Sequence, residues 1–248
     1  MPYLYKRVRT KHRDFVTRTK CLCYNYDHTK KHRGVRLCRT GEGKEKRNKR
    51  AAYLKKKYEI YNNFDKGDMW ITLTYNKANI PGSPEEAHKT LMNVLSKIRK
   101  KLSRKNIPFK YYIKTEAGER VRVHHHLFIH NNFKVVSMLY EYWKEYGKVK
   151  DFQEIYDFES GRLVKYFLDG GDHKGLDFEK YSHSRNMVEP DVEKRIYPYS
   201  SFREMPKPPR PEDGCIFEIQ NLKNFFPDID GFIYQEYEIV KREVRLDE

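Results

Sequence analysis

Residues 108–130 read PFKYYIKTEAGERVRVHHHLFIH, and this stretch decides the fold that the sequence predicts. Two runs rich in aromatic and β-branched residues flank the short loop AGER, a pattern typical of an antiparallel β-hairpin. Successive side chains of a strand point to opposite faces, so His124 and His126 project together while His125 faces the other way. The hairpin therefore predicts a sheet with two imidazoles on one face.

Two imidazoles on one face indicate a metal site more strongly than a lone histidine does, since a lone histidine is more often a structural residue. A pair at this spacing can bind one divalent ion, and the neighbouring strand can supply a third ligand. Glu116, at the end of the first strand, is the expected carboxylate, with Glu119 in the loop as a competing candidate. These donors leave positions open on Mn²⁺ or Mg²⁺, as phosphate chemistry requires, and zinc also accepts them.

Regular elements are predicted on both sides of the hairpin. Ser83, followed by Pro84 and by Glu86 three residues after the cap, forms a capping box that starts a helix. Strand-like and helix-like patterns also predict a helix at 45–64, a strand at 69–75, a helix at 135–146, a strand at 147–158 and a short helix at 160–171. Hairpin-linked strands mixed with helices indicate an α+β fold with a central antiparallel sheet and flanking helices.

The net charge of +16 is concentrated at the N-terminal end of the chain. Residues 1–57 hold 20 Lys and Arg against four Asp and Glu, whereas the remaining residues hold 31 of each kind. A basic block such as KEKRNKR (44–50) is the expected footprint of a protein that binds a polyanion, most often a nucleic acid. The alternative is a solvated basic tail that aids solubility.

Cysteine usage and hydropathy argue for an intracellular protein. Four cysteines in 248 residues are too few for the disulfide framework of a small secreted protein. A zinc site is conceivable near the N-terminus, although the usual two-residue spacer is missing; its ligands would be Cys21, Cys23, Cys38, His28 and His32. No apolar run reaches the length of a membrane span, and the basic start lacks the apolar core of a signal peptide.

The order of four motifs resembles the HUH endonucleases, a family named for a histidine–hydrophobe–histidine motif. The motifs are TLTY (72–75), Glu116, the His-x-His of HHHLFI (124–129), and a tyrosine on a short helix about forty residues later. More narrowly, KYFLDGG (165–171) followed by KYSHSRNMVEP (180–190) is similar to the replication initiators of small rolling-circle plasmids and phages. The resemblance covers roughly residues 45–195.

This resemblance implies a ferredoxin- or RRM-like palm and a division into three segments. These are a basic extension at 1–44, the endonuclease domain at 45–200, and a proline-rich linker with a C-terminal tail at 201–248. The implied substrate is single-stranded DNA at a replication origin, in the cytoplasm of a bacterial host. Since the chain has no GKS or GKT phosphate loop, a host helicase and a DNA polymerase are the expected partners, and two copies could pair on DNA.

The implied reaction is attack of a tyrosine on a DNA phosphodiester, which leaves a 5′-phosphotyrosine and a free 3′-hydroxyl that primes synthesis. By position the nucleophile is Tyr166, and Glu116, His124 and His126 match the metal ligands. Helix geometry agrees, because the apolar residues around Tyr166 lie on one arc and Tyr166 points away from its centre. Tyr156 and Tyr181 are the nearby competitors, and stacking on DNA is the alternative role of Tyr166.

One departure from the family pattern concerns a lysine that relatives commonly carry three residues after the tyrosine. This chain has Asp169 there, and Lys165, His173 or Lys174 are the candidates to replace it. Phosphate contacts are expected from basic side chains at Lys44, Lys46, Arg47, Lys49, Arg50, Lys165 and Arg185. Ser182 and Ser184 could also position phosphates, without a catalytic role.

Two other functions fit the same residues. Within the same chemistry, a single-tyrosine transposase or a plasmid-transfer relaxase would use the same groups. From a different class, a non-catalytic nucleic-acid-binding protein would use the histidines for a structural metal. The number of protein ligands separates the two classes, because a structural site is closed by four ligands whereas a catalytic site keeps a position open.

Overall fold

The computed structural model describes residues 3–20, 41–118, 121–158, 161–169, 176–197, 206–211, 215–225 and 234–243. The chain divides into unit 1, residues 1–62 and 189–248, and unit 2, residues 63–188. Each unit contains a five-stranded sheet in which all neighbouring strands are antiparallel. The predicted α+β class is therefore confirmed. No helix among these residues is long and apolar enough to cross a membrane.

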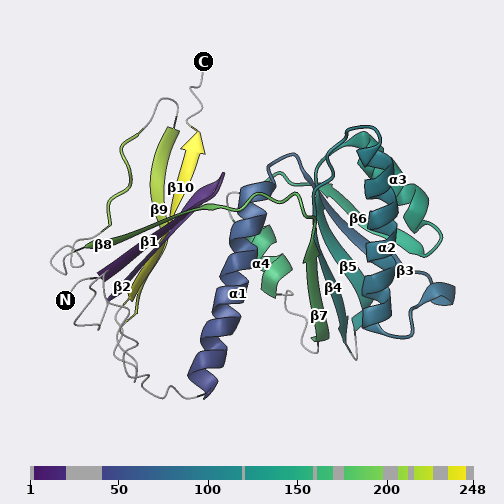
Figure 1. The fold of residues 1–248 in the computed structure, drawn as a ribbon, viewed down its shortest axis with the longest axis horizontal. Coiled ribbons are helices and arrows are strands. Elements are labelled where there is room, and N and C mark those ends of the chain that lie inside the picture. Colours follow the sequence, from purple (N-terminus) through teal and green to yellow (C-terminus); the bar gives the residue numbers. More distant parts are fainter. Residues whose placement is uncertain are drawn as a thin grey trace. The chain divides into compact units, whose positions relative to one another are not determined.

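Unit 2 holds the predicted hairpin at the centre of its sheet, in the order β6-β3-β5-β4-β7 (Figure 1). Its elements are β3 (Met69–Tyr75), the 3₁₀ turn η1 (Lys77–Asn79), α2 (Pro84–Ser103), β4 (Tyr111–Gly118), β5 (Val121–Ile129), α3 (Phe133–Trp143), β6 (Gly147–Glu154), α4 (Arg162–Asp169) and β7 (Leu176–His183). The elements predicted for this region are all present, with ends shifted by a few residues. The strand β7 was not predicted.

Helices α2 and α3 cover one face of this sheet (Figure 1). The first begins as its capping box predicts, since the Ser83 hydroxyl accepts a hydrogen bond from the Glu86 amide at 3.2 Å. The apolar side of α2, including Leu91 and Leu95, packs with Trp143 of α3 in one fully buried core. This core packs α2 and α3 on one face of the sheet, and the candidate site lies on the other face.

The opposite face is covered by α4 and by a cluster of aromatic rings. Phe167 of α4 lies 5.0 Å from Phe128 and 5.6 Å from Trp70, measured between ring centroids. Phe167 and Leu168 are buried, as the predicted apolar arc requires, whereas Tyr166 keeps 43% of its surface exposed. The short helix is therefore held against the sheet by its apolar side and presents Tyr166 beside the histidines of β5.

A chain of hydrogen bonds, buried at its centre, crosses the face of the sheet that α2 and α3 cover. It runs from Ser182 through His88, Thr115 and His125 to Tyr75, which donates to the carbonyl oxygen of Ala87. Because that carbonyl only accepts, Tyr75 accepts from Nε2–H of His125 at 2.9 Å, and Nδ1 of His125 accepts from Thr115, also at 2.9 Å. Thr115 in turn accepts from His88 at 2.8 Å. Every bond then points in one direction.

The imidazoles of His88 and His125 are both neutral, because each donates one hydrogen bond and accepts one in this series. Burial, assisted by the charge of Lys180, lowers the pKa of His88 to about 4. Burial also lowers the pKa of His125 well below its ordinary value. His125 is therefore a structural residue on the side of β5 that faces away from His124 and His126.

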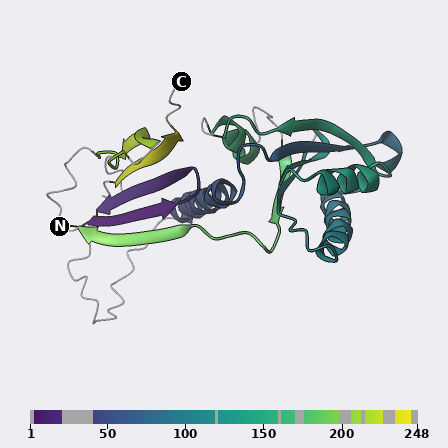
Figure 2. The same cartoon turned by 90° about the horizontal axis from the view of Figure 1, so that it is seen from above.

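Unit 1 is a second sheet, with the strand order β8-β1-β2-β10-β9, packed on a long helix (Figure 2). Its elements are β1 (Tyr3–Arg9), β2 (Arg13–Lys20), α1 (Gly41–Asn63), β8 (Asp191–Tyr197), β9 (Cys215–Phe225) and β10 (Tyr234–Glu243). Phe15 of β2 contacts the rings of Tyr58 and Tyr61 on α1. Beside them, the buried guanidinium of Arg13 pairs with Glu238 of β10 at 2.6 Å.

These units differ from the three segments expected from the sequence, 1–44, 45–200 and 201–248. Strand β2 pairs with β10, and β1 pairs with β8, so the two ends of the chain form one unit. The expected extension and tail both contribute strands to it. These strands are paired with strands far away in the sequence, and ion pairs such as that of Arg9 with Asp191 at 2.8 Å join them. Because the strands mix polar and apolar residues, their sequences lack the alternation that would have predicted a strand.

Candidate metal centre and tyrosine helix

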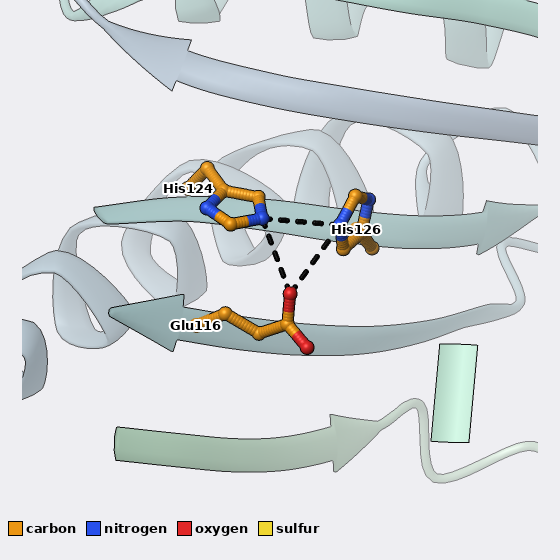
Figure 3. Close-up of side chains that lie close together, drawn as sticks. All are labelled: Glu116, His124 and His126. Atoms are coloured by element: carbon orange, nitrogen blue, oxygen red, sulfur yellow. Dashed lines mark hydrogen bonds and ion pairs between the residues drawn. The ribbon is translucent and has the colours of Figure 1, made fainter. Parts of the chain in front are cut away.

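Three side chains converge on the face of the unit 2 sheet that α4 partly covers (Figure 3). His124 and His126 project from β5, and Glu116 lies directly opposite His124 on β4. The two Nε2 atoms are 3.1 Å apart, and Oε2 of Glu116 is 3.1 Å from that of His124 and 3.5 Å from that of His126. The pairing of the histidines and the carboxylate from the neighbouring strand therefore lie as the sequence predicts. Glu119 lies outside the described residues.

Hydrogen bonds behind the imidazoles direct both Nε2 atoms toward Glu116. Nδ1 of His124 lies 2.9 Å from the carbonyl oxygen of Arg122, which can only accept, so Nδ1 carries the proton and Nε2 keeps its lone pair. Nδ1 of His126 lies 3.0 Å from the hydroxyl of Thr72, which can accept in the same way. Metal-binding histidines are commonly oriented by such a bond on the other ring nitrogen.

The spacing of these atoms fits a shared divalent ion. Ligand atoms about 2.1 Å from one ion lie about 3.0 Å apart at octahedral angles and about 3.4 Å apart at tetrahedral angles. The three separations fall in or next to this range. Two nitrogen lone pairs and a carboxylate oxygen facing one another repel unless a cation lies among them. One carboxylate and two imidazole donors therefore form a site that suits a divalent metal.

Electrostatics keep the donors in their metal-binding forms. Burial alone would raise the pKa of Glu116, but its contacts with His124 and His126 and the ammonium of Lys114 hold it well below its usual range. Burial lowers the pKa of His126, despite the opposing effect of Glu116. The carboxylate is thus ionised and the His126 imidazole neutral near pH 7.

Tyr166 of α4 lies beside this cluster. Its ring centroid is 6.0 Å from that of His126 and 6.3 Å from that of Trp70, which itself stacks on His126 at 4.9 Å. Burial, followed by the charges of Glu116 and Asp151, raises the pKa of the Tyr166 phenol. A phenol in this setting needs a nearby positive charge to act as a nucleophile, and a divalent ion on the cluster would supply one.

The competing tyrosines are placed differently. Tyr181 is partly buried on β7, and its hydroxyl donates to the carbonyl oxygen of Leu168 at 3.1 Å. Tyr156 follows β6 and is 79% exposed, but it does not line the cleft that holds the histidines. Asp169 is exposed at the end of α4, and of the candidates to replace the family lysine, Lys165 is exposed while His173 and Lys174 lie outside the described residues.

An open cleft of about 480 Å³ leads to the cluster. His124, His126 and Tyr166 line it, together with two basic side chains, Arg122 and Lys150. Ile80, exposed to 52%, contributes an apolar wall. Sequence reasoning missed Arg122 and Lys150, although Arg122 shares a strand face with both histidines and could have been found from that alternation.

The basic residues expected to bind DNA are distributed over both units. In unit 1, Lys49 pairs with Glu45 at 2.7 Å and Arg50 pairs with Glu236, while the side chains of Lys44, Lys46 and Arg47 lie outside the described residues. In unit 2, Lys165 is exposed on α4, and Arg185 lines a cavity of about 410 Å³ with Arg99.

The two serines expected near phosphates have structural contacts, and the expected zinc ligands are not described by the structure. Ser184 is buried and accepts from the amide of Tyr111 at 3.2 Å, and Ser182 ends the buried hydrogen-bond chain, so both support the sheet. The expected zinc ligands Cys21, Cys23, Cys38, His28 and His32 lie outside the described residues.

All four groups of the site lie between the turn before β3 and the end of α4. Residues 68–170 match the replication-associated protein ORF2/G2P family. The match bears out the resemblance to replication proteins and indicates a role in DNA replication. Glu116, His124, His126 and Tyr166 all fall within the matched segment, which lies entirely within unit 2. No curated protein and no solved structure gives a significant match to the chain.

Proposed function

We propose that the protein is a metal-dependent endonuclease and strand transferase that nicks single-stranded DNA at an origin and so initiates rolling-circle replication. The observation that carries the proposal is the position of Tyr166, half-exposed in the same cleft as His124 and His126. Glu116, His124 and His126 would hold Mn²⁺ or Mg²⁺, which polarises the phosphate and stabilises the charge that develops on it.

The residues of the cleft have separate tasks in this reaction. Arg122 and Lys150 bind phosphates of the strand on either side of the reacting one. The Tyr166 oxygen forms a bond to phosphorus, the bond from phosphorus to the 3′ oxygen breaks, the phenol loses its proton and the 3′ oxygen gains one. The product is a 5′-phosphotyrosine and a 3′-hydroxyl, and the phosphotyrosine retains the bond energy needed for later rejoining.

The wider biology follows from this reaction. The strand must be unpaired to reach Tyr166, so a helicase of the bacterial host would open the duplex and a host polymerase would extend the 3′-hydroxyl in the cytoplasm. Tyr75 also lines the cleft, but its hydroxyl is bonded to His125 and to the carbonyl oxygen of Ala87. With Tyr166 as the one nucleophile, a second strand transfer needs another copy of the chain on the same DNA, another tyrosine or water. A transposase or relaxase would share the chemistry and differ in its DNA target.

The test uses a labelled single-stranded fragment of the protein's own origin region, incubated with Mn²⁺ and separated under denaturing conditions. Wild-type protein should form a covalent adduct, and Tyr166→Phe should lose it. Tyr156→Phe, a neighbouring exposed tyrosine outside the cleft, is the matched control and should keep it. An adduct that persists in Tyr166→Phe would move the nucleophile elsewhere.

A non-catalytic DNA-binding protein with a structural metal is the second candidate. A closed structural site needs four protein ligands, and the described residues bring together one group of three. This observation favours the catalytic reading. Metal-dependent binding of origin DNA without any nick or adduct would support the second candidate instead.

A further inference from the structure

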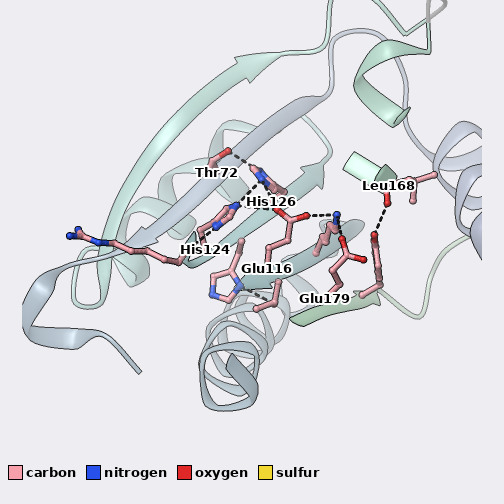
Figure 4. A network of polar contacts seen from close by, with 11 residues as sticks. Thr72, Glu116, His124, His126, Leu168 and Glu179 are labelled. Atoms are coloured by element: carbon pink, nitrogen blue, oxygen red, sulfur yellow. Dashed lines mark hydrogen bonds and ion pairs between the residues drawn. The ribbon is translucent and has the colours of Figure 1, made fainter. Parts of the chain in front are cut away.

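A lysine with no exposed surface lies next to the candidate metal ligands. Lys114 occupies β4 two residues before Glu116, on the same face of the sheet, and its side chain is fully buried. An ammonium with no exposed surface is costly unless it is paired with anions. Lys114 contacts two: it forms an ion pair with Oε1 of Glu116, and it lies 2.7 Å from the carboxylate of Glu179 on β7 (Figure 4).

The two oxygens of Glu116 therefore face different partners. Oε2 points to the imidazoles of His124 and His126, and Oε1 points to the ammonium of Lys114. A carboxylate divided in this way can offer one oxygen to an ion, whereas a free carboxylate can offer two. One oxygen fewer on the ion leaves one position more for water or phosphate.

The same lysine also touches the support of the tyrosine helix. Its Nζ lies 5.4 Å from the ring centroid of Tyr181, and the hydroxyl of Tyr181 donates to the carbonyl oxygen of Leu168 at the end of α4. Lys114 thus contacts both the carboxylate of the cluster and the strand residue that anchors the helix carrying Tyr166.

We propose that Lys114 is a positioning residue of the metal centre: by holding Oε1 of Glu116 it limits this carboxylate to one ligand oxygen and keeps coordination positions open for the DNA phosphate. Glu179 tunes this effect, because it shares the charge of Lys114 with Glu116. The inference rests on the proposed function, and it adds two residues that the ligand cluster does not contain.

Two substitutions should change Mn²⁺ affinity in opposite directions. Lys114→Met removes a cation that repels Mn²⁺ and frees Oε1, so Mn²⁺ should bind at least tenfold tighter. Glu179→Gln leaves the whole charge of Lys114 on Glu116, so Mn²⁺ should bind at least threefold more weakly. Lys180→Met removes the same charge from the opposite face of β7 and is the matched control, expected to stay within twofold of wild type.

The measurement is calorimetric titration with Mn²⁺ in the Tyr166→Phe background without DNA, with the number of Mn²⁺-bound waters determined by electron–nuclear double resonance. Lys114→Met should lose one bound water, and with Tyr166 restored it should nick at least tenfold more slowly despite its tighter metal. A purely structural role predicts weaker binding in both variants.

Several outcomes overturn the inference. Equal affinities, or shifts in the same direction, contradict it. If Lys114→Met does not fold, Glu179→Gln decides alone, and an unchanged affinity in that variant refutes the inference. A wild-type protein that binds no Mn²⁺ defeats this inference and the metal dependence of the proposed function together. A protein that shows the two opposite shifts but forms no DNA adduct supports the role of Lys114 and defeats the nicking reaction alone.

Discussion

Removing one hydroxyl should destabilise unit 2 strongly, because Thr115 joins the two buried histidines. Thr115 is fully buried, and its oxygen lies 2.8 Å from Nδ1 of His88 and 2.9 Å from Nδ1 of His125. Thr115→Val keeps the shape of the side chain and leaves one buried donor and one buried acceptor without a partner. Each such group costs about 1–3 kcal/mol, so the expected loss is about 3 kcal/mol after the gain from the added methyl.

Tryptophan fluorescence during urea unfolding measures this loss in unit 2 specifically, since Trp70 and Trp143 are the protein's two tryptophans and both belong to that unit. At a slope of about 2 kcal/mol per M urea, the midpoint should fall by about 1.5 M. Thr74→Val is the control, because that hydroxyl makes one 3.4 Å contact at the surface, and it should cost less than about 0.5 kcal/mol. A loss of unfolding free energy below about 1 kcal/mol for Thr115→Val would refute the assigned hydrogen bonds of Thr115 with His88 and His125.

Three further predictions concern pH, metal affinity and helix capping. The pKa of His88 is about 4 in the folded protein against an ordinary 6.5, so His88 binds fewer protons in the folded protein. The free energy of unfolding of unit 2 should therefore fall as the pH drops from 6.5 to 4. In urea titrations at several pH values, this fall should be smaller for His88→Gln. Thr72→Val removes the bond that orients His126 and should weaken Mn²⁺ binding about tenfold by calorimetry. Ser83→Ala should lower the unfolding free energy by about 1 kcal/mol in a urea titration, and no change would mean that the cap contributes nothing.

The parts of the fold that sequence predicted are those with strong local signals. The capping box at Ser83, the alternation in β3 and the hairpin of β4 and β5 are each complete within about twenty residues. The hairpin pattern placed Glu116 on the strand beside the histidines, with Glu119 as a competing candidate, whereas its register opposite His124 did not follow from the sequence. Tyr166 required the family resemblance, since helix geometry said only that it points away from the apolar arc.

The parts that sequence did not predict depend on contacts between distant residues. Strands β1 and β2 pair with each other but carry charged residues on both faces, and their outer partners, β8 and β10, lie beyond the whole of unit 2. Lys114 could have been placed on the face of Glu116 by its two-residue spacing. The burial of Lys114 could not have been predicted, because it depends on Glu179 and on the pairing of β4 with β7.

The division of the chain also sets an order of events during synthesis. Unit 2 is a continuous stretch that is complete once residue 188 has left the ribosome, so its sheet and site can form while the rest is still being made. Unit 1 forms later, because β1 and β2 are synthesised early whereas β10 is complete only at residue 243. During that interval the edge of β2 that β10 will cover has no strand to pair with, which exposes this strand of the nascent chain to mispairing.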